Sequence, residues 1–249
     1  MGGDGTCFVG RTVSLSRFLS FALPRAKNYP AVAVFTRSAV PGRAKTRLIP
    51  LLGARGAAQL QASLILDTTR KLDRLAGSAV RWLFLAGGEF PRFPGRRQWI
   101  LKKQRGLNLG GRLERAFRQM FRRHRAAVVI GTDSPSLSPR HLRQALAELQ
   151  VCDAVLGPCP DGGFYLIGLR ENPLRLFKGV RWSTAFAFQD MLHNLIARGL
   201  ACSVLPSLAD VDRPEDLIAL ARQMARRSAL RATSPALWHI IQRAQKSWV

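Results

Sequence analysis

The sequence contains few of the residues that mark several common protein classes. It has four cysteines in 249 residues, Cys7, Cys152, Cys159 and Cys202, and none of them forms a CxxC pair. This spacing excludes a disulfide scaffold and a zinc ribbon, and it favours a reduced, cytoplasmic protein. No apolar run approaches the roughly 20 residues that a membrane-spanning helix needs, so we expect no transmembrane segment.

Acidic residues are also scarce, with 15 Asp and Glu against 39 Lys and Arg, which gives a net charge of +24. Such an excess suggests nucleic acid, an anionic membrane or phosphorylated ligands as partners. The basic residues are scattered along the whole chain, however, and no block of them is interleaved with aromatic residues. We therefore expect no specific nucleic-acid partner, although a nucleic-acid-binding protein without enzymatic activity remains an alternative.

Two common nucleotide-binding motifs are missing as well. Neither the Walker pattern GxxxxGK[ST] nor the dinucleotide pattern GxGxxG occurs. What the chain does contain is 47% apolar residues, enough for one sizeable core. Short apolar runs predict strands at residues 31–35, 80–85, 99–101, 126–130, 153–157, 164–169 and 202–205.

Segments with helical spacing lie between these strands. They predict helices at 53–75, through 113–121, at 139–149, at 184–197 with Ser183 as N-cap, from Pro214 onward, and at 235–247. The alternation predicts one α/β domain at 30–228, a poorly ordered extension at 1–29 and a C-terminal helix at 229–249 that packs on the domain. For that last helix, a homodimer contact or a membrane surface is the alternative.

The stretch from Ala126 to Leu137, AAVVIGTDSPSL, is the centre of the expected domain. Its apolar run fits a strand buried on both faces, and Ser138 and Pro139 then suit the start of a helix. Asp133 therefore lies just beyond the carboxyl end of a central strand, where ligands bind in open α/β sheets. A carboxylate there can hold Mg²⁺ beside nucleotide phosphates, although an Asp that only stabilises its own turn is equally compatible.

A basic turn follows the first expected strand. Pro41 and Gly42 force the turn, and the residues around it are Arg37, Arg43, Lys45 and Arg47. Backbone amides and basic side chains at the carboxyl end of a strand suit a phosphate site. The alternative is an ordinary solvated basic loop.

Two further segments carry acids beside glycine or proline. In GPCPDGG, Asp161 precedes Gly162 and Gly163, which suits either a plain hairpin turn or a carboxylate beside a ligand. In LADVDRPEDL, Asp210 and Asp212 precede the helix that Pro214 opens. One of them can cap that helix, but capping leaves the second acid unexplained.

In their order along the chain, these motifs resemble a bacterial family of GT-A-fold transferases known as arsenosugar-biosynthesis glycosyltransferases, or radical-SAM/selenodomain-associated transferases. The segments are FTRSAVPGRAKTRL, QRGLNLGGRLERAF, VVIGTDSPSLSP, DAVLGPCPDGGFYLIGL, FKGVRWSTAF and LADVDRPEDL, between Ala31 and Leu220. More distantly, the chain resembles 2-phospholactate guanylyltransferases and molybdenum-cofactor nucleotidyltransferases. The resemblance implies a three-layer α/β/α sandwich, Rossmann-like, around a mixed, mostly parallel sheet.

The resemblance also implies roles for individual residues. Mg²⁺ or Mn²⁺ is expected on Asp133, with Asp210 or Asp212 as a second ligand, and Asp133, Lys45 and Asp161 are the catalytic candidates. The expected nucleotide and phosphate contacts are Arg37, Gly42, Lys45, Arg47, Gln104, Gly106 and Asn108. The expected acceptor side is Gly162, Gly163, Trp182, Ser183 and Thr184.

The chain departs from the family pattern at two positions, where Asn108 replaces an acid and Gly111 replaces a common Glu. The Gly-rich opening loop of sugar-nucleotide pyrophosphorylases is also absent. The resemblance implies glycosyl transfer from a nucleotide sugar to a small-molecule acceptor. A guanylyl- or cytidylyl-type nucleotidyltransferase acting on a phosphorylated small molecule is the alternative.

Overall fold

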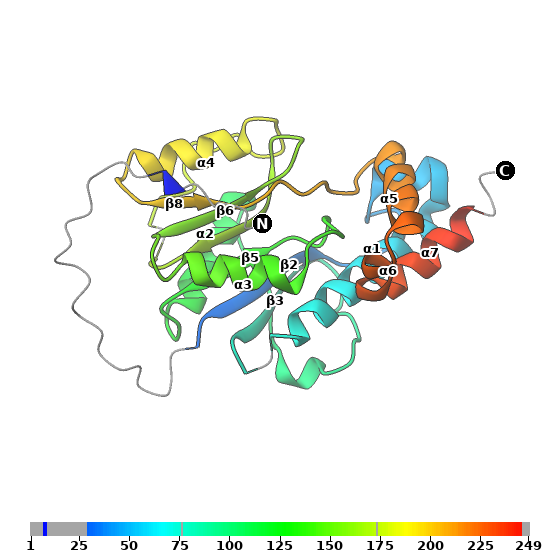
Figure 1. Cartoon of the computed structure of the whole chain (residues 1–249), viewed down its shortest axis with the longest axis horizontal. Coiled ribbons are helices and arrows are strands. Elements are labelled where there is room, and N and C mark those ends of the chain that lie inside the picture. Colours follow the sequence, from blue (N-terminus) through cyan, green and yellow to red (C-terminus); the bar gives the residue numbers. More distant parts are fainter. Residues whose placement is uncertain (1–6, 9–28, 76, 173, 246–249) are drawn as a thin grey trace.

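An eight-stranded sheet forms the centre of the protein in the computed structural model, which describes residues 7–8, 29–75, 77–172 and 174–245. The strand order is β1-β8-β6-β7-β5-β2-β3-β4, and helices lie on both sides of the sheet (Figure 1). Most of the extension expected at 1–29 lies outside the described residues. None of the helices in the described ranges has the length and apolar character needed to cross a bilayer.

The strands lie close to the positions predicted from the apolar runs. They are β1 (Cys7–Phe8), β2 (Ala31–Arg37), β3 (Val80–Ala86), β4 (Ile100–Lys103), β5 (Ala127–Ile130), β6 (Ala154–Pro158), β7 (Phe164–Leu169) and β8 (Cys202–Val204). The two-residue strand β1 was not predicted. It pairs antiparallel with β8 at one edge of the sheet.

Helices and 3₁₀ turns connect most of the strands. They are η2 (Thr46–Leu48), α1 (Ile49–Asp73), η3 (Arg96–Gln98), α2 (Leu109–Met120), α3 (Pro139–Glu148), α4 (Ala187–Ile196), α5 (Pro214–Arg226), α6 (Ser228–Thr233) and α7 (Pro235–Gln245). Helix α1 is kinked at Gly53, whose φ of 67° is not helical, so the part after the kink agrees with the helix predicted at 53–75 and a short helical segment from Ile49 precedes it.

Six strands of the sheet run in one direction. Strand β2 pairs parallel with β3 and β5, β3 with β4, and β6 with β8. Strand β7 lies antiparallel between β5 and β6. The predicted mixed, mostly parallel sheet is thus confirmed, and the carboxyl ends of β2, β3 and β5 meet at one edge.

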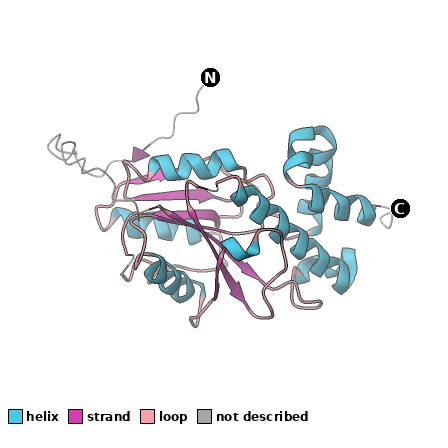
Figure 2. Ribbon diagram, turned by 90° about the horizontal axis from the view of Figure 1, so that it is seen from below, coloured by secondary structure: helices cyan, strands magenta, loops and turns pink. Residues whose placement is uncertain are grey.

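Alternate residues of the strands build two separate cores, because successive side chains point to opposite faces. On one face, Ala33, Phe84 and Val129 pack with residues of α2 and α4. On the other face, Val34 and Leu83 pack with residues of α1 and α3. The result is the predicted three-layer α/β/α sandwich, which Figure 2 shows from another side.

A third apolar cluster lies beyond the sheet. It joins the first half of α1 to the C-terminal helices α5, α6 and α7, with Leu60, Met224 and Ile241 among its buried members. The carboxylate of Asp67 on α1 accepts hydrogen bonds from the amides of Ala236 and Leu237, at 3.3 and 2.8 Å, in the first turn of α7. These contacts fix α7 against α1 (Figures 1 and 2).

Candidate active site at the carboxyl edge of the sheet

Three buried polar side chains join the ends of β2 and β5 to α1. The hydroxyls of Thr36 and Thr132 are 3.1 Å apart, and the amide of Gln61 donates to Thr36 Oγ1 at 3.0 Å and reaches Thr132 Oγ1 at 3.4 Å. Thr36 lies near the end of β2, before the predicted basic turn, and Thr132 lies just after β5, next to Asp133. The bonds therefore hold these two segments in a fixed relation at the edge of the sheet.

The ammonium of Lys45 lies between two carboxylates that are far apart in the sequence. Its Nζ atom is 2.5 Å from Asp133 Oδ1 and 2.8 Å from Asp212 Oδ1, and it also donates to the Val211 carbonyl at 2.7 Å. The Lys45 side chain is only 5% exposed. Burial lowers the pKa of Lys45, but Asp133 and Asp212 more than offset this, so its pKa is raised.

The late acidic segment runs beside the Asp133 turn. The amide of Val211 donates to the Asp133 carbonyl at 2.8 Å. The alternative in which Asp210 or Asp212 caps α5 is wrong. Instead, Asp216 in the first turn of α5 accepts from the amides of Asp212 and Arg213, at 3.1 and 2.8 Å. Because Asp216 makes the cap contacts, Asp212 is left to bind Lys45.

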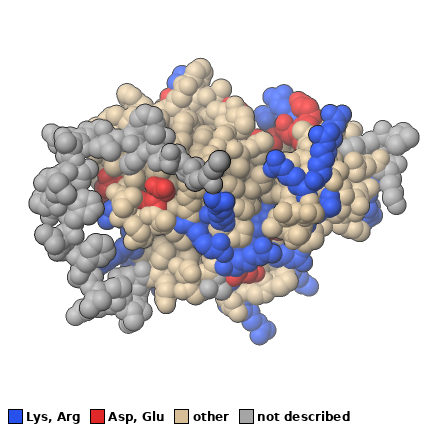
Figure 3. Space-filling view, in the orientation of Figure 1, with Lys and Arg blue, Asp and Glu red and all other residues tan. Residues whose placement is uncertain are grey.

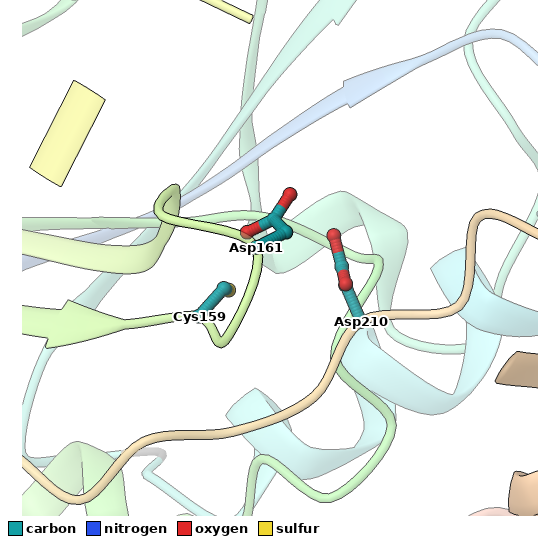
Figure 4. A group of neighbouring side chains, drawn as sticks. All are labelled: Cys159, Asp161 and Asp210. Atoms are coloured by element: carbon teal, nitrogen blue, oxygen red, sulfur yellow. The ribbon is translucent and has the colours of Figure 1, made fainter. Parts of the chain in front are cut away.

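A second group of potential ligand atoms lies where the hairpin between β6 and β7 meets the segment between β8 and α5. Cys159, Asp161 and Asp210 offer sulfur and oxygen atoms that all lie within 4.8 Å of one another (Figure 4). Burial, with Asp210 and Asp161 nearby, raises the pKa of the Cys159 thiol to about 12, so it stays protonated. Burial and the charges of Asp161, Asp212 and Asp133 raise the pKa of Asp210 to about 6.

The DGG turn packs directly on the segment that follows Trp182. Gly162 has a φ of 85°, and a Cβ atom there would overlap the Ala185 carbonyl. The Gly162 carbonyl also accepts from the amide of Phe188 at 2.8 Å, and Asp161 accepts from the amide of Gly163 at 2.9 Å. Asp161 therefore makes a local turn contact in addition to facing Asp210.

The prediction that Ser183 caps a helix from residue 184 is wrong. Helix α4 begins at Ala187 after Phe186, and Ser183 has a left-handed φ of 62°. Thr184 closes a turn instead, because its hydroxyl donates to the Arg181 carbonyl at 2.7 Å and accepts from the Phe186 amide at 3.2 Å. Hydrogen bonds from a Ser or Thr side chain to nearby backbone favour such turns over helix.

The residues between Gln104 and Asn108 that were predicted to contact the nucleotide have partners within the protein. The amide nitrogen of Gln104 donates to the carbonyls of Thr36 and Phe84, at 2.9 and 3.0 Å. Asn108 caps α2 by accepting from the Gly111 amide at 2.9 Å. Gly106 allows a close approach, because a Cβ atom there would lie 2.6 Å from the Arg112 nitrogen.

The remaining predicted residues lie on or beside the basic turn. Gly42 has a φ of 76° and no atom close to its missing side chain, and Arg37 is exposed at the end of β2. Arg47 is 65% exposed, and its guanidinium is 4.0 Å from Asp212 Oδ2. On the other loop, Trp182 packs against Gly110 at the start of α2. The predicted acceptor-side segment around Trp182 thus touches the start of α2, next to the predicted nucleotide contacts at 104–108.

Sequence reasoning missed two polar residues on α1, Gln61 and Lys71. Lys71 is 3% exposed and donates to the carbonyl of Pro135, in the Asp133 turn, at 2.6 Å. The available signal was that Gln61, Asp67 and Lys71 lie close to the apolar positions Leu60, Leu64 and Leu72 of the helix, among several other polar residues. That pattern does not tell which residue each would bind.

The donor set around Lys45 fits the divalent cation that the resemblance implies. Asp133 and Asp212 already hold a positive charge between carboxylate oxygens, the ligand type that Mg²⁺ and Mn²⁺ prefer. The Cys159, Asp161 and Asp210 group fits such a hard cation less well, because the cysteine sulfur is a softer ligand than the oxygen atoms that Mg²⁺ prefers. Its two carboxylates nevertheless add negative charge to the same edge.

Residues 65–184 match the model of a family described as uncharacterized proteins conserved in bacteria (DUF2064). No functionally curated protein matches the chain. The arsenosugar-specific part of the resemblance has no counterpart in these matches.

Solved structures share the fold over most of their length. A "putative nucleotide-diphospho-sugar transferase" from Desulfovibrio desulfuricans G20 is 29% identical, with a TM-score of 0.77, over 87% of this chain and 98% of that chain. The inositol-1-phosphate CTP transferase from T. maritima is 12% identical, with a TM-score of 0.50, over 82% and 98%. A homologue, from Mycobacterium sp. strain JC1, of a Mycobacterium tuberculosis protein is 15% identical, with a TM-score of 0.51, over 78% and 97%.

Proposed function

We propose that the protein is a metal-dependent transferase that uses a nucleotide-activated donor and moves a sugar to a small-molecule acceptor. The observation that carries the proposal is the cation, the Lys45 ammonium, held between Asp133 and Asp212 at the carboxyl edge of the sheet. Similarity to the Desulfovibrio protein supports a nucleotide-sugar donor.

The residues at this edge divide the work of such a transfer. Asp133 and Asp212 would hold Mg²⁺ or Mn²⁺, which when bound neutralises the donor diphosphate and its leaving group. Lys45 and Arg47 add positive charge beside the same phosphates. Asp161, exposed on the β6–β7 turn, can take the proton of an acceptor hydroxyl.

In the glycosyl reaction, the acceptor oxygen forms a bond to the anomeric carbon. The bond from that carbon to the donor phosphate breaks, and the nucleoside diphosphate leaves with the electron pair. The acceptor proton passes to Asp161. Catalysis then rests on positioning and charge, so no covalent enzyme intermediate is needed.

The test is a thermal-shift screen of nucleoside diphosphates, nucleoside triphosphates and nucleotide sugars, each with and without Mn²⁺. A ligand at a hundred times its Kd stabilises the folded state by about 2.7 kcal/mol, so a binding nucleotide should raise the Tm by several degrees. In Asp133→Asn the Mn²⁺-dependent part of the rise should vanish. Glu171→Gln, an exposed acid outside the site, is the control.

Different results would point elsewhere. A Tm that no nucleotide changes, together with salt-dependent retention on DNA, would replace the proposal with a nucleic-acid-binding protein. Release of pyrophosphate from a nucleoside triphosphate, with no nucleoside diphosphate formed from a nucleotide sugar, would replace glycosyl transfer with nucleotidyl transfer. The same edge of the sheet would serve that reaction through attack on the α-phosphate.

A further inference from the structure

The Lys45 ammonium has no hydrogen bond left to offer. An ammonium carries three N–H donors, and three acceptors surround this one: Asp133 Oδ1, Asp212 Oδ1 and the Val211 carbonyl, at 2.5, 2.8 and 2.7 Å. With the side chain 5% exposed, solvent provides little else. Lys45 can therefore bind a phosphate oxygen only after it gives up one of these partners.

A divalent cation would need the same place. Nζ now lies between Asp133 Oδ1 and Asp212 Oδ1. Mg²⁺ lies about 2.0–2.1 Å from its oxygen ligands, so a cation bound through these two oxygen atoms occupies the space where Nζ now lies. Two positive charges a few Å apart repel each other, and the ammonium and the cation cannot both bridge the two Oδ1 atoms.

The surroundings of Lys45 allow the side chain to move outward. Lys45 has a left-handed φ of 46°, a conformation that a residue with a side chain adopts rarely. Ala44, directly before it, is buried, but Pro41, Gly42 and Arg43 are exposed, and space is open around Gly42. A Lys45 side chain that turns toward these three residues therefore enters an exposed part of the loop.

We propose that Lys45 and the divalent cation are alternative occupants of one position between Asp133 and Asp212, and that the donor phosphates drive the exchange by accepting the hydrogen bonds of Lys45. The inference rests on the proposed function. Metal alone then binds weakly, because it must displace an ion-paired lysine. Nucleotide and metal favour each other's binding by the same factor, since such coupling is reciprocal.

The experiment measures free Mn²⁺ by electron paramagnetic resonance during titration of wild type, Lys45→Met and Lys178→Met, alone and with ADP, CDP, GDP or UDP. Lys178 is an exposed lysine outside the site, so its variant controls for the loss of one charge. Without nucleotide, Lys45→Met should bind Mn²⁺ about tenfold more tightly than the other two proteins. The enhancement by nucleotide, typically five- to 150-fold for coupled sites, should shrink in Lys45→Met alone.

Chelation of Mn²⁺ by nucleotide in solution is common to all three proteins, so the ratios between them isolate Lys45. Lys45→Gln, which can still donate to both carboxylates, is the second variant in case Lys45→Met does not fold. Mn²⁺ affinity that is unchanged or weaker in a folded Lys45 variant overturns the inference and leaves the proposed function standing. No Mn²⁺ binding by any of the proteins, with any nucleotide, overturns both.

Discussion

At the scale of single residues, Gly162 offers a sharp test of the acceptor-side geometry. Its φ is 85°, and a side chain would collide with the Ala185 carbonyl. Gly179 has a similar φ of 79° but no atom within 4 Å of the missing side chain. Alanine at either position forces a strained backbone, and only at Gly162 does it also force the two loops apart.

We expect Gly179→Ala to lower the free energy of unfolding by about 1–2 kcal/mol, the strain of a left-handed residue. Gly162→Ala should lower it by a further 1–3 kcal/mol, roughly the effect of overpacking. Urea denaturation measures both. Equal losses in the two variants would show that the contact between the DGG turn and residue 185 contributes nothing.

The residue types at the site could be predicted, but their partners could not. Asp133 and Lys45 stood out because they lie in polar turns that follow apolar strands, and Asp212 because it is one of two acids just before the helix that Pro214 opens. Nothing in the sequence said that Lys45 would bind both acids, because that contact depends on where the segment at 211–212 crosses the sheet edge. Asp210 and Asp212, two residues apart, also have different neighbours: Asp161 and Cys159 for the first, Lys45 for the second.

At the scale of elements, the attachment of α7 depends on one buried carboxylate. Asp67 is 2% exposed and accepts from two amides of the first turn of α7. Burial raises the pKa of Asp67, and those backbone bonds together with Lys71 and Arg70 act in the other direction. The group thus combines a helix cap with a buried charge pair.

Asp67→Asn should lower the free energy of unfolding by about 1–3 kcal/mol, because it removes a charged acceptor from buried amides. Amide exchange in residues 235–245 should accelerate as well. Urea denaturation and hydrogen exchange provide the two measurements, and Glu171→Gln on the surface is the control. Unchanged exchange in α7 would show that apolar packing alone holds this helix.

The strands could be predicted well because each is a short apolar run in a sheet covered on both faces. Helix starts were harder. The predicted cap at Ser183 is wrong, since Thr184 bonds to nearby backbone and delays α4 until Ala187. The part of α1 that follows Gly53 agrees with the helix predicted at 53–75, because the φ of 67° at this glycine interrupts the helical backbone and separates the preceding turn. The side-chain competition at Thr184 leaves no clear mark in hydrophobic spacing.

At the scale of the whole molecule, buried Lys71 should shape the dependence of stability on pH. Burial, and Arg74 nearby, lower its pKa to about 8 from the ordinary 10.5, although Asp67 opposes this. Below pH 8 Lys71 is protonated in both the folded and the unfolded chain, so the folded state bears the full free-energy cost of burying its charge. Between pH 8 and 10.5 only the unfolded chain binds the proton, so this group makes stability rise with pH.

The free energy of unfolding of wild type minus that of Lys71→Met should therefore increase between pH 7.5 and 10. The change is at most about 3 kcal/mol, since each pKa unit is worth about 1.4 kcal/mol. Urea denaturation at several pH values measures it. Taking the difference cancels the other groups that titrate there, and Lys178→Met should show no trend. A flat difference for Lys71→Met would mean that the lysine stays charged throughout.

The net charge of +24 is a property of the surface rather than of the site. Figure 3 shows lysine and arginine side chains at several places on one face, with acids among them. The fold could be predicted without reference to this charge, because apolar periodicity decides the layers. In the sequence the basic residues are scattered along the chain, which differs from the clustered pattern typical of nucleic-acid binding.

The bond between Lys45 and Asp212 also determines when the site can form during synthesis of the chain. The two residues are 167 positions apart. A ribosome adds about 5–20 residues per second, so roughly ten to thirty seconds pass between the synthesis of one and of the other. Until Asp212 has been added, Lys45 and then Asp133 lack the crossing segment that completes their surroundings. A nascent chain can therefore build most of its sheet well before it can bind a substrate.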